Sequence, residues 1–230
     1  MSRVEQRQPR RRRDPEGTRL AILEAAKTML SQDGAEGLSV SGVAKLAGVN
    51  RGTAYQHFEL KEDLVRATLD WVSSQLLDAV FPEDIDPGEV AGASEVDIGQ
   101  LVSRMAQFSV RLADFAIDNP DIGRIWLYDL LSRDNPSEDV FYKRFMRSVQ
   151  DMVQGGAGEE GIDIEVLTVL MLSGFFLWPV WVSSHAQSKR ARKSMSRRFA
   201  GEVLRLSMHG VLRADTHALL QSYLEQNPVR

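Results

Sequence analysis

Cysteine is absent from the 230 residues of this chain. Its absence excludes a disulfide framework, a thiolate zinc site, an iron–sulfur cluster and a cysteine nucleophile. Histidine is scarce, and the four that occur, His57, His185, His209 and His217, lie too far apart in sequence for metal-ligand spacing. We also find no serine–histidine–aspartate set, no glycine-rich phosphate loop and no paired-carboxylate motif. The sequence therefore predicts neither an enzyme nor a resident metal or cofactor.

Long apolar runs are almost absent as well. The N-terminal residues MSRVEQRQPRRRRD are basic and lead into no apolar run of the kind that a secretory signal needs, so we expect a disordered arm over residues 1–17. The exception is the run of residues 166–188, which contains no Asp, Glu, Lys or Arg. Its length allows either a membrane-spanning helix or a helix buried by its own domain and a partner subunit. The amphipathic helices elsewhere need a surface to pack on, which favours the buried helix.

Charge is unevenly distributed along the chain. Residues 1–61 contain 11 basic and 7 acidic side chains, although the whole chain has a net charge of −4. A basic first quarter joined to an acidic body predicts that only the N-terminal part meets a polyanion. Chance together with one arginine-rich tail is the alternative that charge alone leaves open.

Helical periodicity dominates, and no alternating strand pattern is convincing. Residues 98–118, for example, repeat apolar side chains at Leu101, Met105 and Phe108. The predicted helices cover residues 18–31, 51–57, 62–80, 98–118, 137–153, 162–186, 194–213 and 215–226, with further helices starting after Ser39 and at Pro120. The sequence therefore predicts an all-α protein.

The densest pattern is LSVSGVAKLAGVNRGTAYQHFELK at residues 38–61. Ser39 can cap a helix, Gly48 supplies the left-handed residue that ends it, and Asn50 can cap a second, very short helix, Arg51–His57. Two helices separated by a tight glycine turn make a helix-turn-helix, whose second helix enters the major groove of DNA. The polar series on so short a helix favours DNA binding over two ordinary core helices.

Residues 18–65 resemble the TetR (tetracycline repressor) family of bacterial regulators. The resemblance is carried by Ile22-Leu23-x-Ala25-Ala26, Gly34, Val43-Ala44-x-x-Ala47-Gly48-Val49, Gly52-Thr53-x-Tyr55-x-His57-Phe58, and Lys61 with Leu64. It implies a three-helix helix-turn-helix DNA-binding domain over residues 18–65 and a larger helical domain over residues 66–230 that binds a small molecule and forms a homodimer. It further implies a cytoplasmic transcriptional regulator, a repressor that leaves a palindromic operator on double-stranded DNA when the effector binds. A constitutive DNA-binding dimer without a ligand and a membrane-tethered regulator are the alternatives.

Two residues depart from the pattern of the family. Ala54 stands where a large apolar residue is usual, so we expect a less firmly packed recognition helix. Leu60 stands where a small polar cap is usual, and losing such a cap costs about 1 kcal/mol. The start of the following helix is therefore expected to depend on packing.

The expected DNA contacts follow from side-chain chemistry. Arg51 can pair with a guanine edge and Gln56 with an adenine edge, and Thr53 can reach a base methyl or a phosphate. Phosphate contacts, which set register, are expected for Tyr55, His57 and Lys61. The alternative for His57 is that it is a partly buried structural residue and does not contact phosphate. The full predicted DNA-binding set is Ser39, Asn50, Arg51, Gly52, Thr53, Tyr55, Gln56, His57 and Lys61, with Arg10, Arg11, Arg12 and Arg13 of the arm.

Basic residues occur in two further places. The arginines of the arm either enter a narrow minor groove or only add non-specific attraction. The cluster at residues 189–198 is expected to be a solvated turn between helices rather than a second DNA site.

For the second domain the sequence supplies candidates rather than a site. Pockets in helical bundles are mostly apolar with few polar groups, so an apolar or aromatic effector is expected. Arg104 precedes Phe108 by one turn and could orient an acidic ligand. The candidate ligand-binding residues are Trp71, Arg104, Phe108, Trp126, Tyr128, Phe175 and Trp178, with core packing as the alternative for any single aromatic.

The long apolar helix also leads to an expectation about assembly. We expect residues 162–186 and 194–213 to pair with their copies across a two-fold axis in a four-helix interface. Ser173 and Gly174 would allow the close approach of two backbones. Leu172 and Phe175 would lie in that interface.

Overall fold

The structure is a computed structural model, and it describes residues 14–82, 98–212 and 214–227. The chain divides into two compact units, residues 1–68 and 69–230, and the division falls three residues after the boundary expected from sequence. The described residues form ten α-helices and two short 3₁₀ turns, with a single isolated bridge between Gly158 and Leu212 and no strand. The all-α prediction is confirmed.

The first unit contains α1 (Pro15–Gly37), α2 (Val40–Leu46), α3 (Arg51–His57) and the first turns of α4 (Lys61–Val80). Its buried side chains come from all four helices and from the residues just after α1 and α3, and they are Ile22, Leu23, Ala25, Ala26, Leu38, Val40, Val43, Ala44, Ala54, Phe58, Leu64 and Thr68. The glycine turn between α2 and α3 forms as predicted, since Gly48 has a φ of +68°. Gly34 has the same φ, which breaks the helical path within α1 before its last residues.

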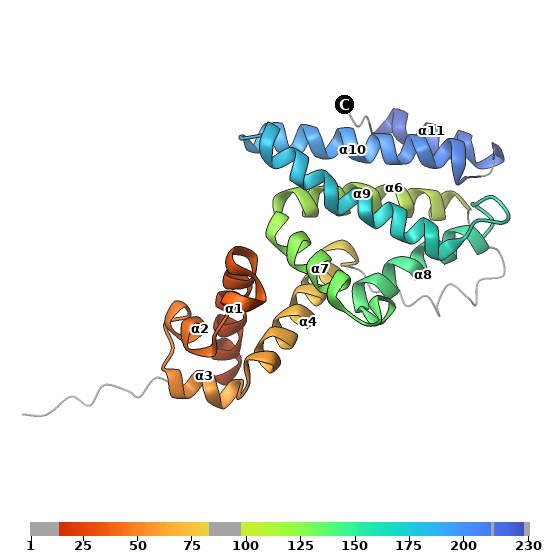
Figure 1. The fold of residues 1–230 in the computed structure, drawn as a ribbon. Coiled ribbons are helices and arrows are strands. Elements are labelled where there is room, and N and C mark those ends of the chain that lie inside the picture. Colours follow the sequence, from red (N-terminus) through yellow and green to blue (C-terminus); the bar gives the residue numbers. More distant parts are fainter. Residues whose placement is uncertain (1–13, 83–97, 213, 228–230) are drawn as a thin grey trace, which may run out of the picture. The chain divides into compact units, whose positions relative to one another are not determined.

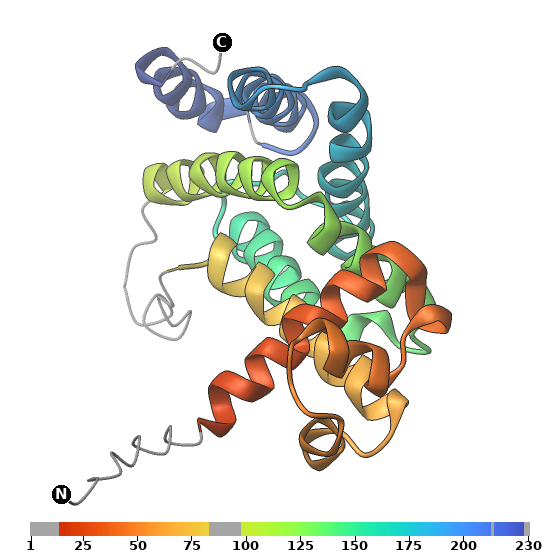
Figure 2. The same ribbon diagram turned by 90° about the vertical axis from the view of Figure 1, so that its left-hand side faces the viewer.

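The second unit is a helical bundle built around α6 (Ile98–Asp118). The helices after it are α7 (Pro120–Ser132), α8 (Val140–Gln154), α9 (Ile164–His185), α10 (Lys189–Gly210) and α11 (His217–Gln226), with 3₁₀ turns at Pro136–Glu138 and Ala214–Thr216. Helices α10 and α11 lie side by side against α6, and α9 packs on α6, α7 and α8 (Figures 1 and 2). The apolar face of α6 at Val102 and Ala106 contacts the buried Leu204 of α10 and Leu220 of α11.

The start of α10 differs from the prediction. The helix begins at Lys189 rather than at residue 194, because the side chain of Ser188 accepts a hydrogen bond of 3.1 Å from the Ala191 amide and caps it. The basic cluster is therefore the first part of a helix, not a turn. Its Lys193 and Arg192 pair with acidic side chains of α6. These contacts give part of the cluster a packing role.

Helix α9 has one buried and one exposed apolar face. It is the one helix in the described part of the chain that is long and apolar enough to cross a membrane. Leu172 and Phe175 are buried within their own chain, so the expectation that they face a partner is wrong. A Cβ at Gly174 would lie 3.3 Å from the ring of Phe199, so this glycine makes room for α10 of the same chain.

A buried carboxylate joins three helices of the second unit. Asp139 is 2% exposed and caps α8 by accepting a 2.8 Å hydrogen bond from the Tyr142 amide. Its two carboxylate oxygens also accept from the hydroxyl of Ser73 in α4 at 2.6 Å and from the indole Nε1 of Trp126 in α7 at 3.0 Å. The single side chain thus satisfies buried donors on α4, α7 and α8.

Candidate DNA-binding and ligand-binding sites

The helix-turn-helix is built by two capped helices around a small buried residue. The hydroxyl of Ser39 accepts a 3.1 Å hydrogen bond from the Gly42 amide, and the Asn50 side chain accepts one of 2.8 Å from the Gly52 amide. Ser39 and Asn50 are therefore the N-caps of α2 and α3, and the side chain of each is engaged in its capping hydrogen bond. Ala54 is fully buried, and its small size lets α3 approach α2 closely.

The outer face of α3 is polar and open. Arg51, Gly52, Tyr55 and Gln56 are exposed, whereas Thr53 and the predicted phosphate ligand His57 are half-buried. Long donor-bearing side chains on an exposed helix are what readout of base edges requires.

Tyr55 is held in place by its neighbours. Its hydroxyl lies 3.5 Å from the Ser41 hydroxyl of α2, and the Arg51 guanidinium lies 5.5 Å from the centre of its ring. The hydrogen bond with Ser41, followed by the interaction with Arg51, lowers the pKa of Tyr55 below its usual value. Ser41 is a residue that sequence reasoning missed, because nothing in the motif indicates a partner fourteen positions away.

Lys61 is anchored to the first helix. Its Nζ donates a 3.3 Å hydrogen bond to the carbonyl of Glu36, near the end of α1. The charge of Lys61 therefore lies at the N-terminus of α4, and the residue before this helix, Leu60, is exposed.

Arg19 of α1 was also missed by the sequence reasoning, and its guanidinium lies 4.5 Å from the centre of the Phe58 ring. The arm residues Arg10, Arg11, Arg12 and Arg13 lie outside the described residues.

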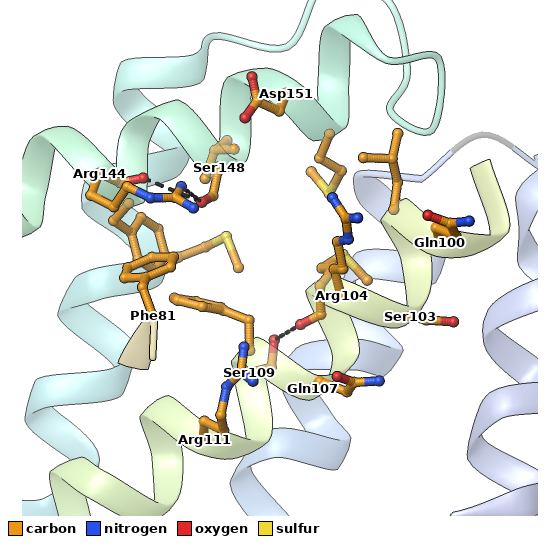
Figure 3. Close-up of a pocket in the computed structure, with 17 residues that line it drawn as sticks. Phe81, Gln100, Ser103, Arg104, Gln107, Ser109, Arg111, Arg144, Ser148 and Asp151 are labelled. Atoms are coloured by element: carbon orange, nitrogen blue, oxygen red, sulfur yellow. Dashed lines mark hydrogen bonds between the residues drawn. The ribbon is translucent and has the colours of Figure 1, made fainter. Parts of the chain in front are cut away.

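The second unit contains a cavity of about 400 Å³ between α6 and α8. Two of the predicted ligand-binding residues, Arg104 and Phe108, line it from α6. Figure 3 shows Arg104 extending from that helix. Phe81, just after α4, and Met171 of α9 also line it. The size falls in the range of small-molecule sites.

The other five candidates do not line this cavity. Trp126 and Phe175 are buried in the core, and Trp178 is half-buried, stacked on Phe199, and donates a 3.2 Å hydrogen bond to the carbonyl of Met195. Trp71 is half-buried on α4, and Tyr128 is exposed on α7. Helical periodicity predicts that these residues lie on apolar helix faces. It does not predict which of those faces lines the cavity. Among the described residues, no group of three or more His, Asp or Glu side chains is placed to hold a metal ion.

The capped helix pair with its polar outer face defines the first unit as a helix-turn-helix domain. Residues 22–68 match the family model described as "Bacterial regulatory proteins, tetR family". The N-terminal unit therefore matches the TetR family by sequence, and the fold of the chain resembles solved structures of TetR family regulators.

Curated relatives match only the N-terminal region. A segment of 61 residues is 39% identical to the HTH-type transcriptional regulator TtgR of Pseudomonas putida, and covers 26% of this chain and 29% of that protein. A segment of 53 residues is 42% identical to AcrR of Shigella flexneri, and covers 23% of this chain and 25% of that protein. The chain thus aligns with less than a third of the length of these relatives.

Solved structures resemble most of the chain in fold. A gamma-butyrolactone receptor described as ArpA-like has a TM-score of 0.61 at 19% identity, over 93% of this chain and 99% of that one. A TetR family regulator from Marinobacter aquaeolei VT8 also has a TM-score of 0.61 at 19% identity, over 81% of this chain and 95% of that one. The ketosteroid transcriptional regulator KstR2 of Mycobacterium tuberculosis has a TM-score of 0.55 at 15% identity, over 85% and 95%. These likenesses concern the fold alone.

Proposed function

We propose that this protein is a cytoplasmic transcriptional repressor that binds a palindromic operator as a homodimer and is released by a small molecule. The observation that carries the proposal is the exposed polar face of α3 on a capped helix-turn-helix. In this role Arg51 reads a guanine and Gln56 an adenine through paired hydrogen bonds. Tyr55, His57 and Lys61 contact phosphates, which fix the position of α3 in the groove.

Binding to DNA is tested with palindromic fragments from upstream of the protein's own gene and its neighbours. Arg51→Ala should relax base preference at one position in each half-site, with a loss of about 1–3 kcal/mol of discrimination. Arg66→Ala, which removes the same charge from an exposed site on α4, is the matched control and should leave the base preference intact. Wild-type protein that binds the palindromes no better than random DNA would refute the proposed function.

Lys61→Ala tests the contacts that carry no sequence information. The change should weaken binding to every sequence alike and make log K depend less steeply on log salt. Since Lys61 also bonds to the Glu36 carbonyl, thermal unfolding of the variant must be measured beside the binding. A loss confined to one operator sequence would contradict a phosphate contact.

The exposed face of α9 supports the homodimer. Leu170, Leu177 and Trp181 are each more than three-fifths exposed along one side of the helix, where an isolated chain would leave them in water. A second copy packed there buries the stripe and places two recognition helices about 34–36 Å apart, or a multiple of that, for a two-fold site. Membrane insertion of the same helix is the competing use.

Light scattering without detergent separates these uses. Wild type should be a dimer at micromolar concentration, and Leu177→Glu should give monomers or aggregates because it buries an unpaired charge. Leu131→Glu is the control, since Leu131 of α7 is even more exposed and lies off this face. A monomeric wild type would contradict the dimer, and a wild type that is insoluble without detergent would favour the membrane.

The cavity between α6 and α8 supports a ligand. Its volume and largely apolar lining suit a small molecule. Occupation of the cavity is proposed to lower the affinity of the dimer for its operator. A constitutive DNA-binding dimer would keep the same operator affinity with every compound that binds the second unit.

A further inference from the structure

We propose that the effector is an apolar molecule with one carboxylate, held between arginines at the mouth of the α6–α8 cavity. The inference deepens the proposed function, because it presupposes that this cavity is the ligand site. It concerns the chemical class of the ligand and the two residues that select it, Arg104 and Arg111.

The interior of the cavity suits an apolar body. Phe108 lies with its ring centre 4.9 Å from that of Phe81 and 5.2 Å from that of Phe145, which makes a continuous aromatic wall. Met105, Met152 and Met171 also line the space. Methionine side chains are flexible and adapt to ligands of varied outline. The wall therefore favours an aliphatic or aromatic body over a polar one.

The charges at the cavity are mostly positive. Arg104, Arg111 and Arg144 line it, and Asp151 is the one acidic side chain among the lining residues that the structure describes. Arg104 and Arg111 lie on the same face of α6, four and three residues on either side of Phe108. Both side chains are exposed.

Arg144 adds to this field from the facing helix. It donates a 2.7 Å hydrogen bond to the Ser148 hydroxyl, and its guanidinium lies 4.3 Å from the centre of the Phe81 ring. Figure 3 shows Arg104 extending from α6 and Arg144 lying on α8 across the space that the aromatic rings border. Three guanidinium groups thus line the same cavity as the aromatic rings.

This arrangement selects an anion. A guanidinium presents paired donors that match a carboxylate, and hydrogen bonds to an ionised group are about twice as strong as neutral ones. A neutral ligand of the same shape would gain the apolar contacts alone. The arginines therefore add affinity only for a ligand with a negative group at the mouth.

A matched pair of probes tests the charge. Decanoate and γ-decanolactone contain the same numbers of carbon and oxygen atoms, but only decanoate is charged at pH 7, and a lactone is the ligand named for one neighbour in fold. In calorimetry with the full chain, we expect decanoate to bind about ten-fold more tightly than the lactone. Equal affinities, tighter binding of the lactone, or no binding of decanoate at millimolar concentration would overturn the proposal.

Substitutions locate the site. Arg104→Gln and Arg111→Gln should each lower the affinity for decanoate about five-fold or more and leave the lactone unaffected. Arg147→Gln is the control, because it removes the same charge from the exposed side of α8, outside the cavity lining. Decanoate binding that neither cavity variant weakens, while circular dichroism shows them folded, would place it elsewhere and overturn the proposal.

The experiment is independent of DNA. Calorimetry measures the cavity in the absence of an operator, and a gel shift measures operator binding of the same variants without decanoate. If decanoate binds no more tightly than the lactone while operator binding is intact, only the proposal of a carboxylate effector is refuted. If the protein binds no operator but still prefers decanoate to the lactone, the proposed function in transcription is refuted. The protein would then be one that binds organic acids.

Discussion

Replacing Asp139 with alanine should destabilise the second unit by about 3 kcal/mol. The substitution removes the acceptor for three donors at once: the Tyr142 amide at the start of α8, the Ser73 hydroxyl and the Trp126 indole. Because the site is buried, water cannot replace the lost acceptor. The donors are therefore left unpaired in the core.

The magnitude is the sum of two kinds of loss. Loss of a helix cap costs about 1 kcal/mol. Two buried donors left without their acceptor cost about 1–3 kcal/mol each. Part of this loss is offset, because the variant no longer has to bury a carboxylate. Asp139→Asn keeps one side-chain oxygen as an acceptor and offers an amide donor to Ser73, so it should cost about half as much as alanine.

Tryptophan fluorescence during thermal unfolding measures the effect selectively. All four tryptophans, Trp71, Trp126, Trp178 and Trp181, lie in the second unit, so the signal does not report the first. For a unit of this size, 3 kcal/mol lowers the midpoint by roughly 6–12 °C. A shift of that size should appear with Asp139→Ala.

Asp163→Ala is the matched control. Asp163 caps α9 through a 3.0 Å hydrogen bond from the Val166 amide, but it is exposed. It should lose only the cap, which lowers the midpoint by about 2–4 °C. If Asp139→Ala and Asp163→Ala lower the midpoint equally, the bonds to Ser73 and Trp126 contribute nothing and the reasoning is refuted.

Three further outcomes are expected. Gly48→Ala should cost about 1–2 kcal/mol of stability, because φ is positive there although the space is open, whereas Gly210→Ala, also in open space, should not. Deleting residues 1–13 removes six arginines and should make the salt dependence of operator binding shallower; an unchanged slope would mean that the arm does not meet DNA. Burial raises the pKa of Asp129 despite the Arg133 guanidinium, so the folded form holds its proton more tightly than the unfolded chain. The stability of wild type relative to Asp129→Asn should therefore fall as pH rises above about 4, as urea midpoints across pH would reveal.

The helix-turn-helix could be predicted from sequence because its determinants are local. Ser39 and Asn50 cap helices within three residues of themselves, and the positive φ of Gly48 is a property of a single residue. The bond between Ser41 and Tyr55 was not predictable in the same way. It depends on the angle between two helices, which no short pattern encodes.

The cavity depends on long-range packing and was only partly predicted. Arg104 and Phe108 were found because a one-turn spacing places a charge beside an aromatic ring on one helix face. Arg111 and Arg144 were missed, although Arg111 continues the same face of α6. Trp126 was misplaced as a lining candidate because its amphipathic indole suits a pocket as well as a core, and only the buried Asp139 acceptor decides between them.

Helix α9 has apolar residues both on the side that packs in the core and on the side that is exposed. Its apolar residues are distributed all round the helix, so periodicity could not assign Leu172 and Phe175 to the core and Leu170 and Leu177 to the outside. The structure makes that assignment because α6, α7, α8 and α10 of the same chain already cover one side. What remains exposed is a narrower stripe than the sequence suggests, and a stripe of that kind is what a second copy can cover by a two-fold axis. The predicted interface therefore stays on α9, but the residues that must be mutated to test it move half a helical turn away.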